Sequence, residues 1–191
     1  MAYHFKVALV GYGAVGKTAL FHRLQTGEYT ETYIPTIGVS VNQLAFNTNK
    51  GLVTFAIWDC AGQEKFAGLS DGYYIQARCA ILMYDVQSIE SYKQLPKFHS
   101  GLMRVVGPVP MVVVANKEDV PMEERQVTPK RAVFHRKKTL PLIETSVQDN
   151  LNLEEPFLQL ARQLTGFQDL EFIEDLSKPE SNVKVCHFTS F

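Results

Sequence analysis

The chain has 191 residues, of which 46% are hydrophobic and 20% are charged, and its formal net charge is -1. These values predict one soluble globular domain with a sizeable core. The net charge is close to zero, so the protein as a whole has no electrostatic attraction to nucleic acid, and we expect no direct binding to it. No stretch approaches the ~20 apolar residues of a membrane span. The three cysteines have neither metal-ligand spacing nor a pairable framework, so we expect a reducing compartment.

Short apolar runs alternate with helix-length segments along most of the chain. Strands are predicted at residues 5–10, 39–46, 52–58, 79–84 and 111–115. Helices are predicted at residues 17–24, 88–106 and 153–164, with a bend at Pro96 in the second. An Asn- and Gly-containing joint at residues 47–51 predicts a hairpin. This order predicts an α/β fold with a mainly parallel sheet.

Residues 11–18 read Gly-Tyr-Gly-Ala-Val-Gly-Lys-Thr, directly after the first predicted strand. The spacing is typical of a phosphate-binding loop, because Gly11 and Gly16 permit a tight turn that points N–H groups at phosphate oxygens. The following helix N-terminus adds partial positive charge. Lys17 is expected to reach the β- and γ-phosphates, and the Thr18 hydroxyl to ligate Mg²⁺. The nucleotide-binding residues predicted here are Gly11, Gly13, Ala14, Val15, Gly16, Lys17, Thr18 and Ala19.

Residues 59–63 read Asp-Cys-Ala-Gly-Gln, straight after the third apolar run. An aspartate at the end of a strand beside a phosphate loop suits the Mg²⁺ shell, which makes Asp59 a second expected metal ligand. Gly62 can give its N–H to a γ-phosphate, and Gln63 can orient an attacking water. In isolation this pattern is more often a turn with a capping aspartate. Its position in a chain with a phosphate loop favours the metal site.

Residues 116–119 read Asn-Lys-Glu-Asp after the fifth apolar run. The carboxylate of Asp119 can accept hydrogen bonds from both N1–H and the exocyclic amine of guanine, a donor pair that adenine lacks. Asn116 and Lys117 are expected to brace the loop and flank the ring. Alone, these four residues would be interpreted as a polar turn. Following the two earlier motifs, they predict guanine as the base.

The three motifs, in this order, resemble those of the Ras superfamily of small GTPases over residues 5 to about 170. The resemblance implies a single P-loop NTPase domain at residues 1–170, with a mainly parallel six-stranded sheet, one antiparallel edge strand and helices on both faces. Residues 171–191 are interpreted as a tail. The resemblance also implies bound GTP or GDP, Mg²⁺ as cofactor and slow GTP hydrolysis. It further implies an exchange factor and a GTPase activator as partners.

Further site residues are implied by the same resemblance. The segment 33–38 is similar to the first switch, in which Thr36 senses the γ-phosphate through Mg²⁺, and Tyr29 matches an aromatic residue against the base. Residues 146–148 match the Ser-Ala-Lys base motif, with Gln148 in place of lysine. The added nucleotide-binding residues are Tyr29, Tyr33, Thr36, Ser146, Val147 and Gln148. The implied metal ligands are Thr18, Thr36 and Asp59, and the implied catalytic residues are Gln63, Lys17 and Thr36.

Within the superfamily, the runs 46–51, 58–66, 71–77 and 133–138 resemble the Ran subfamily of nuclear-transport GTPases. That resemblance implies importin- and exportin-type transport receptors and Ran-binding domains as partners, and a location in nucleus and cytoplasm. No membrane anchor is expected, because Phe188 stands where a prenylation box requires cysteine. The chain departs from that subfamily at Ser70, where the subfamily has arginine, and at its end, which lacks an acidic cluster.

Three alternatives remain open from the sequence. A Rab-like trafficking GTPase would share the nucleotide chemistry but bind other partners. A pseudo-GTPase would hold nucleotide without turnover, and the presence of Gln63 and Thr36 argues against it. An ATPase of another P-loop class would lack the guanine selection that Asp119 predicts. The chain also contains a basic cluster, which comprises Lys130, Arg131, Arg136, Lys137 and Lys138. This cluster is either a solvated face or a binding site for an acidic partner.

Overall fold

The structure is a computed structural model that describes residues 1–30, 35, 36, 38–60 and 70–173. Its strands are β1 (Ala2–Gly11), β2 (Val39–Thr48), β3 (Gly51–Cys60), β4 (Cys79–Asp85), β5 (Met111–Asn116) and β6 (Leu142–Glu144). Its helices are α1 (Lys17–Thr26), α2 (Ser70–Tyr74), α3 (Ile89–Lys93), α4 (Leu95–Val106), α5 (Phe134–Lys138) and α6 (Glu155–Thr165), with a 3₁₀ turn, η2, at Met122–Glu124. None of these helices is long and apolar enough to cross a membrane.

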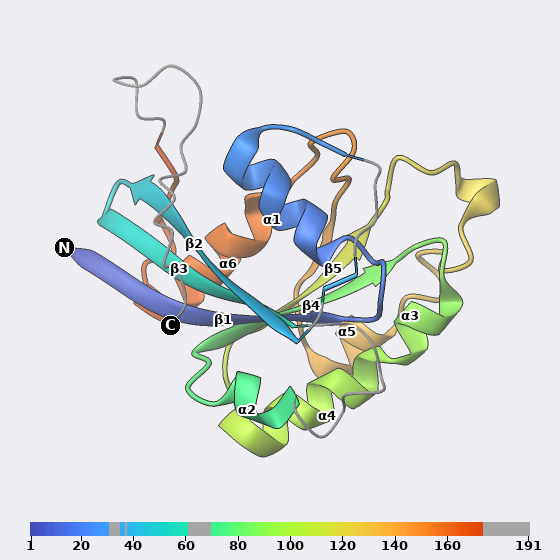
Figure 1. Cartoon of the computed structure of the whole chain (residues 1–191), viewed down its shortest axis with the longest axis horizontal. Coiled ribbons are helices and arrows are strands. Elements are labelled where there is room, and N and C mark those ends of the chain that lie inside the picture. The colour runs from blue at the N-terminus through green and yellow to red at the C-terminus, as the bar shows by residue number, and fades with distance from the viewer. Residues whose placement is uncertain (31–34, 37, 61–69, 174–191) are drawn as a thin grey trace.

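The strands form one six-stranded sheet in the order β2-β3-β1-β4-β5-β6. β2 runs antiparallel to β3, whereas β1 is parallel to β3 and β4, β4 to β5, and β5 to β6. The predicted mainly parallel sheet with one antiparallel edge strand is therefore confirmed. Because β1, β4 and β5 point the same way, their carboxyl ends gather at one edge, where the loops of the predicted motifs begin (Figure 1).

Helices cover both faces of the sheet, as predicted (Figure 1). On one face, side chains of α1 and α6 pack with Phe46 and Phe55 of the hairpin strands, and Phe157 of α6 lies 5.6 Å from both of those rings. On the other face, α2, α3, α4 and α5 pack against alternate residues of β1, β4 and β5. All seven residues of β4 are buried, as expected for a parallel strand covered on both sides.

The long predicted helix at residues 88–106 is two helices in the structure. Ser88 caps α3, because its hydroxyl oxygen accepts a hydrogen bond from the Ser91 backbone N at 3.2 Å. The second helix, α4, starts anew at Leu95 with Pro96 in its first turn, where a missing N–H costs no internal hydrogen bond. The proline thus starts a helix here, where a bend within one helix was expected.

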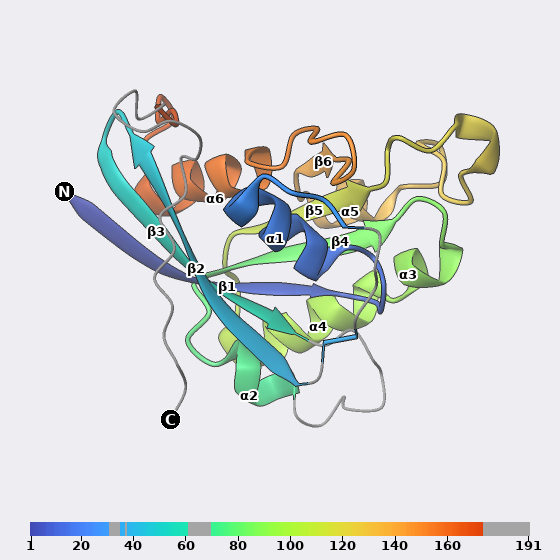
Figure 2. The same ribbon diagram turned by 45° about the horizontal axis from the view of Figure 1, so that its top comes forward.

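The tip of the β2–β3 hairpin contacts the last described residues of the chain (Figure 2). Phe172 stacks on Phe46 with 4.3 Å between ring centroids, and an antiparallel bridge joins Phe172 to Thr48. The backbone N of Ile173 donates to the Asn47 carbonyl at 2.9 Å, and Lys50 pairs with Asp169. Packing onto the hairpin therefore continues to Ile173. The domain boundary at residue 170 stays a prediction.

Candidate nucleotide-binding site

The phosphate loop connects β1 to α1 and depends on two glycines. At Gly11 a Cβ atom would lie 2.2 Å from the Met83 carbonyl oxygen on β4, so only glycine lets the strands approach this closely. Gly16 has a φ of 98°, and a Cβ there would lie 2.4 Å from Nδ2 of Asn116. A left-handed backbone and a close neighbour therefore both require glycine immediately before α1. This arrangement directs the loop toward the N-terminus of that helix.

Lys17 is the buried cation of this loop, with only 6% of its surface exposed. Its Nζ donates to the carbonyl oxygens of Gly11 at 3.0 Å and Tyr12 at 2.9 Å. Burial lowers the pKa of Lys17 to about 8, against the opposing effect of the Asp59 carboxylate and, more weakly, Cys60. A buried ammonium satisfied by neutral carbonyl groups stands ready to interact with an anionic ligand.

The three predicted metal ligands lie together although they come from three segments. Oγ1 of Thr18 donates to Oδ2 of Asp59 at 2.5 Å, and it lies 2.9 Å from Oγ1 of Thr36. The other carboxylate oxygen of Asp59, Oδ1, is buried and has no hydrogen-bond partner among the described residues. Burial raises the pKa of Asp59, while the Thr18 bond and Lys17 oppose that rise. An orphaned oxygen beside two hydroxyl groups fits a hard cation such as Mg²⁺.

A single carboxylate does not hold a cation alone. Within the described part of the chain, no group of three or more His, Cys, Asp or Glu residues could hold a metal ion. Mg²⁺ bound through one carboxylate commonly takes its remaining ligands from phosphate oxygens and water. The donor set of Thr18, Thr36 and Asp59 therefore suits a magnesium ion that arrives with a nucleotide.

The predicted base loop is tied to the phosphate loop through Asn116. Its Nδ2 donates to the Val15 carbonyl at 2.9 Å, and its Oδ1 accepts from Thr145 Oγ1 at 3.2 Å and from the Val147 backbone N at 3.3 Å. Asn116 is itself only 2% exposed. One buried amide thus joins the three nucleotide loops, which fixes the base side of the site relative to the phosphate side.

Ser146 orients the proposed base-selecting carboxylate. Its hydroxyl donates to Oδ1 of Asp119 at 2.6 Å and accepts from the Asp149 backbone N at 2.9 Å. A carboxylate offers about four lone-pair positions, so one bond leaves acceptor capacity for the two guanine donors. Lys117 has a positive φ of 69°, and its ammonium pairs with the Asp85 carboxylate at 2.5 Å. The loop therefore presents an oriented acceptor beside an anchored lysine.

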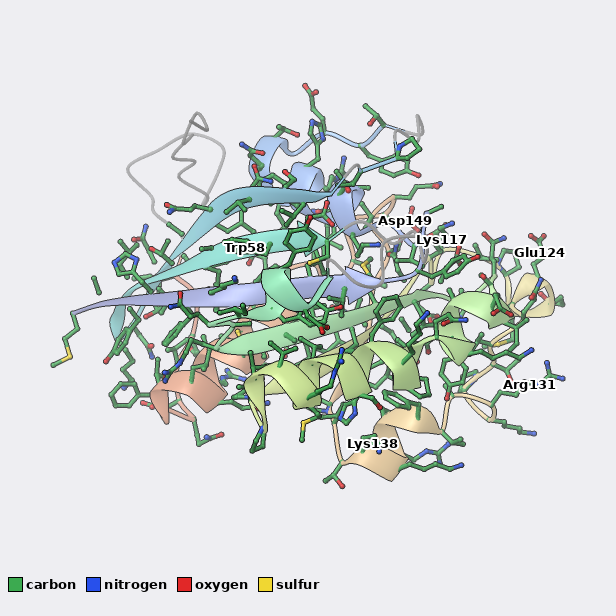
Figure 3. The ribbon with its side chains drawn as sticks, turned by 60° about the horizontal axis from the view of Figure 1, so that its bottom comes forward. Trp58, Lys117, Glu124, Arg131, Lys138 and Asp149 are labelled. Carbon is green, nitrogen blue, oxygen red and sulfur yellow. The ribbon has the colours of Figure 1, made fainter. Side chains whose placement is uncertain are left out.

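Of the other predicted residues, Gly13, Ala14 and Val15 lie between β1 and α1, and Ala19 lies in α1. Tyr33, Gly62 and Gln63 lie outside the described residues. Tyr29 and Gln148 are exposed at the surface, and the Val147 side chain packs in the core. Figure 3 shows Lys138 and Arg131 of the basic cluster at the outer margin of the molecule, apart from Lys117.

Sequence reasoning missed two contributors to the base loop. Asp85 ends β4 at the same edge as the phosphate loop, and its position after a buried strand was a usable signal. Arg125 contacts the loop from the η2 turn, and no spacing in the sequence indicated it. Both residues lie outside the three motifs, so a motif search alone does not find them.

The fold and site together define an α/β P-loop nucleotide-binding domain. A family model described as Ras family matches residues 6–166. The chain belongs to the Ras family, and it is therefore a small GTPase of the molecular-switch type. Members of this family bind GTP and GDP, typically with Mg²⁺, and are regulated by exchange factors and GTPase activators.

Proposed function

We propose that this protein is a Ran-like switch, which binds transport receptors in its GTP form and hydrolyses GTP slowly. The observation that carries the nucleotide chemistry is the cluster of Thr18, Thr36 and Asp59 beside the buried Lys17. Thr36 belongs to the predicted first switch, so its contact with Thr18 links that switch to the metal position. Loss of the γ-phosphate would remove one reason for Thr36 to stay there.

The chain's own residues have separate tasks in hydrolysis. Loop N–H groups and Lys17 hold the phosphates and stabilise charge on the transferring phosphoryl group. Mg²⁺, held by Thr18, Thr36 and Asp59, would supply further neutralisation of the β- and γ-oxygens. Gln63 places the attacking water. The phosphate loop segment 12–15 offers no cation, so an activating arginine comes from a partner or is absent.

Hydrolysis is tested by single-turnover phosphate release from GTP. Without an activator, Ras-type proteins run at roughly 10⁻⁴ s⁻¹, and an activator accelerates them about 10⁵-fold. Gln63→Leu should lower even the activated rate while leaving GTP binding intact, because the glutamine acts on water and not on the nucleotide. Identical rates for wild type and Gln63→Leu would instead support the pseudo-GTPase alternative.

The transport role is supported by the Ran-like runs at residues 71–77 and 133–138 and by the basic cluster. Arg136, Lys137 and Lys138 are exposed on α5, where they can attract an acidic partner. Such attraction between exposed charges is screened beyond about 8 Å at physiological ionic strength, so it should weaken as salt rises. This proposal places the protein in both nucleus and cytoplasm, with importin-type receptors and Ran-binding domains as partners.

A pull-down from cell extract distinguishes the partner classes. Gln63→Leu loaded with GTP is the bait, and Thr18→Asn in the GDP form is its control, because loss of the Thr18 hydroxyl weakens the Mg²⁺ and γ-phosphate sites most. We expect transport receptors on the GTP-loaded bait only, with recovery falling as salt is raised. Recovery of membrane-tethering factors, or location on vesicles, would favour the Rab-like alternative.

A further inference from the structure

Arg125 lies outside the sequence motifs, yet its guanidinium makes three contacts with the base loop. Nε donates to the Val120 carbonyl at 2.7 Å, and Nη2 donates to the Glu118 carbonyl at 2.6 Å. Nη1 pairs with the Glu118 carboxylate. The two carbonyl groups belong to the residues immediately before and after Asp119. One rigid, planar side chain therefore holds the peptide unit before Asp119 and the peptide unit that follows Val120.

The ion pair between Arg125 and Glu118 is largely removed from water. Their side chains are 12% and 11% exposed. Burial raises the pKa of Glu118, and the nearby carboxylates of Glu144 and Asp119 add to that rise, while Arg125 opposes it. Arg125 thus offsets the negative charge around Glu118. Removing it would leave Glu118 buried without its partner and facing two other carboxylates.

The loop has a backbone that needs such support. Lys117 adopts a positive φ of 69°, a conformation that side-chain-bearing residues hold only where their surroundings fix it. Two other bonds contribute, since the Glu118 backbone N donates to the Thr145 carbonyl at 3.0 Å and Val120 N donates to the Lys117 carbonyl at 3.1 Å. These bonds hold the loop on its inner side. Arg125, which directly follows η2, adds the hydrogen bonds to the Glu118 and Val120 carbonyl groups.

We propose that Arg125, paired with Glu118, is a positioning residue for guanine recognition, which sets the Asp119 carboxylate in place before the base arrives. This inference rests on the proposed guanine-nucleotide binding at residues 116–119. It goes further, because it assigns selectivity to a side chain that does not touch the base. When the Asp119 carboxylate is already oriented, it favours a base that can donate two hydrogen bonds to it, as guanine does through N1–H and the exocyclic amine.

The test compares release of fluorescent GDP and fluorescent inosine diphosphate from the full chain with Mg²⁺. Inosine lacks the exocyclic amine, so it makes one bond fewer to Asp119 and has less to lose when that carboxylate is misplaced. For Arg125→Met we expect GDP release to accelerate about 10- to 100-fold, the range for loss of a charge-assisted hydrogen bond. Inosine diphosphate release should accelerate less, so the preference for GDP falls.

Three further variants make the result decisive. Arg125→Lys keeps the charge but cannot span three acceptors, so it should shift the preference in the same direction by a smaller factor. Glu118→Gln keeps both carbonyl contacts of Arg125, and its effect should combine non-additively with Arg125→Met. Arg78→Met is the matched control, because Arg78 is exposed and lies between α2 and β4, outside the nucleotide loops. It should behave as wild type.

Each outcome has one meaning. A folded Arg125→Met that releases both nucleotides faster by the same factor, or an unchanged preference in Arg125→Lys, would overturn the positioning role. If Arg125→Met does not fold, Arg125→Lys alone decides. Failure of the wild-type protein to prefer GDP over ATP would instead overturn the proposed function, which is a separate result from an unchanged Arg125 variant.

Discussion

Lys17 is a cation held in a buried position, between the carbonyl oxygens of Gly11 and Tyr12. Its pKa of about 8 means that the nucleotide-free protein loses this charge at mildly alkaline pH. A bound phosphate stabilises the ammonium and raises its pKa, so nucleotide binding takes up a proton above about pH 8. Below that value the ammonium is already charged, and affinity should not depend on it.

GDP affinity should therefore be level below about pH 8 and fall above it by at most about tenfold per pH unit. Equilibrium titration with labelled GDP between about pH 7 and pH 9.5 measures this fall. The control is Lys17→Arg, which stays charged throughout the range and should remove the part of the fall due to Lys17. Equal pH profiles for the two proteins would contradict the assignment.

At the scale of elements, the β2–β3 hairpin connects the metal site to the last described residues. β2 begins at Val39, close in sequence to Thr36, and β3 ends beside Asp59. At the opposite end of the hairpin, the half-buried Phe172 covers Phe46. Because Phe46 also contacts Phe157 of α6, the aromatic stack ties the hairpin tip to the main core.

Phe172→Ala should lower the free energy of unfolding by about 1–3 kcal/mol, less than for a fully buried phenylalanine. Ile173→Ala is the matched control, because Ile173 is 48% exposed and its backbone bond to Asn47 survives the substitution. We expect a loss below about 1 kcal/mol for the control. Urea unfolding followed by circular dichroism measures both. Equal losses would show that the aromatic stack adds nothing to stability.

Local patterns predicted the phosphate loop and most elements, whereas tertiary contacts determined what the sequence did not reveal. The glycine spacing at residues 11–16 lies between a strand and a helix, which is the context of a phosphate-binding loop, so the local pattern was enough to predict the site. In contrast, β6 has three residues and α5 has five, which is too short for a hydrophobic period to show. Phe172 packs on Phe46, which is distant in sequence, and Arg125 bonds to backbone carbonyl groups, which every residue carries. Neither kind of contact produces a recognisable pattern in the sequence.

At the scale of the whole molecule, buried hydrogen bonds connect the loops of the nucleotide site to one another. We therefore expect guanine selection to depend on the relative positions of all these loops. Asn116 links the phosphate loop to Thr145 and Val147, and Ser146 orients Asp119. Replacing Asp119 by asparagine should preserve this framework and change only the pattern of donors and acceptors offered to the base. The amide can donate to the extra oxygen of xanthine, which the carboxylate cannot do.

Competition against labelled GDP tests the central claim, that this chain selects guanine through Asp119. Unlabelled GTP and GDP should displace the label from the wild-type protein, while ATP should not, because adenine lacks the donor pair. In Asp119→Asn the preference should move toward xanthosine diphosphate, with Mg²⁺ dependence retained. Displacement by ATP as readily as by GTP, or an Asp119→Asn protein with unchanged base preference, would contradict the claim.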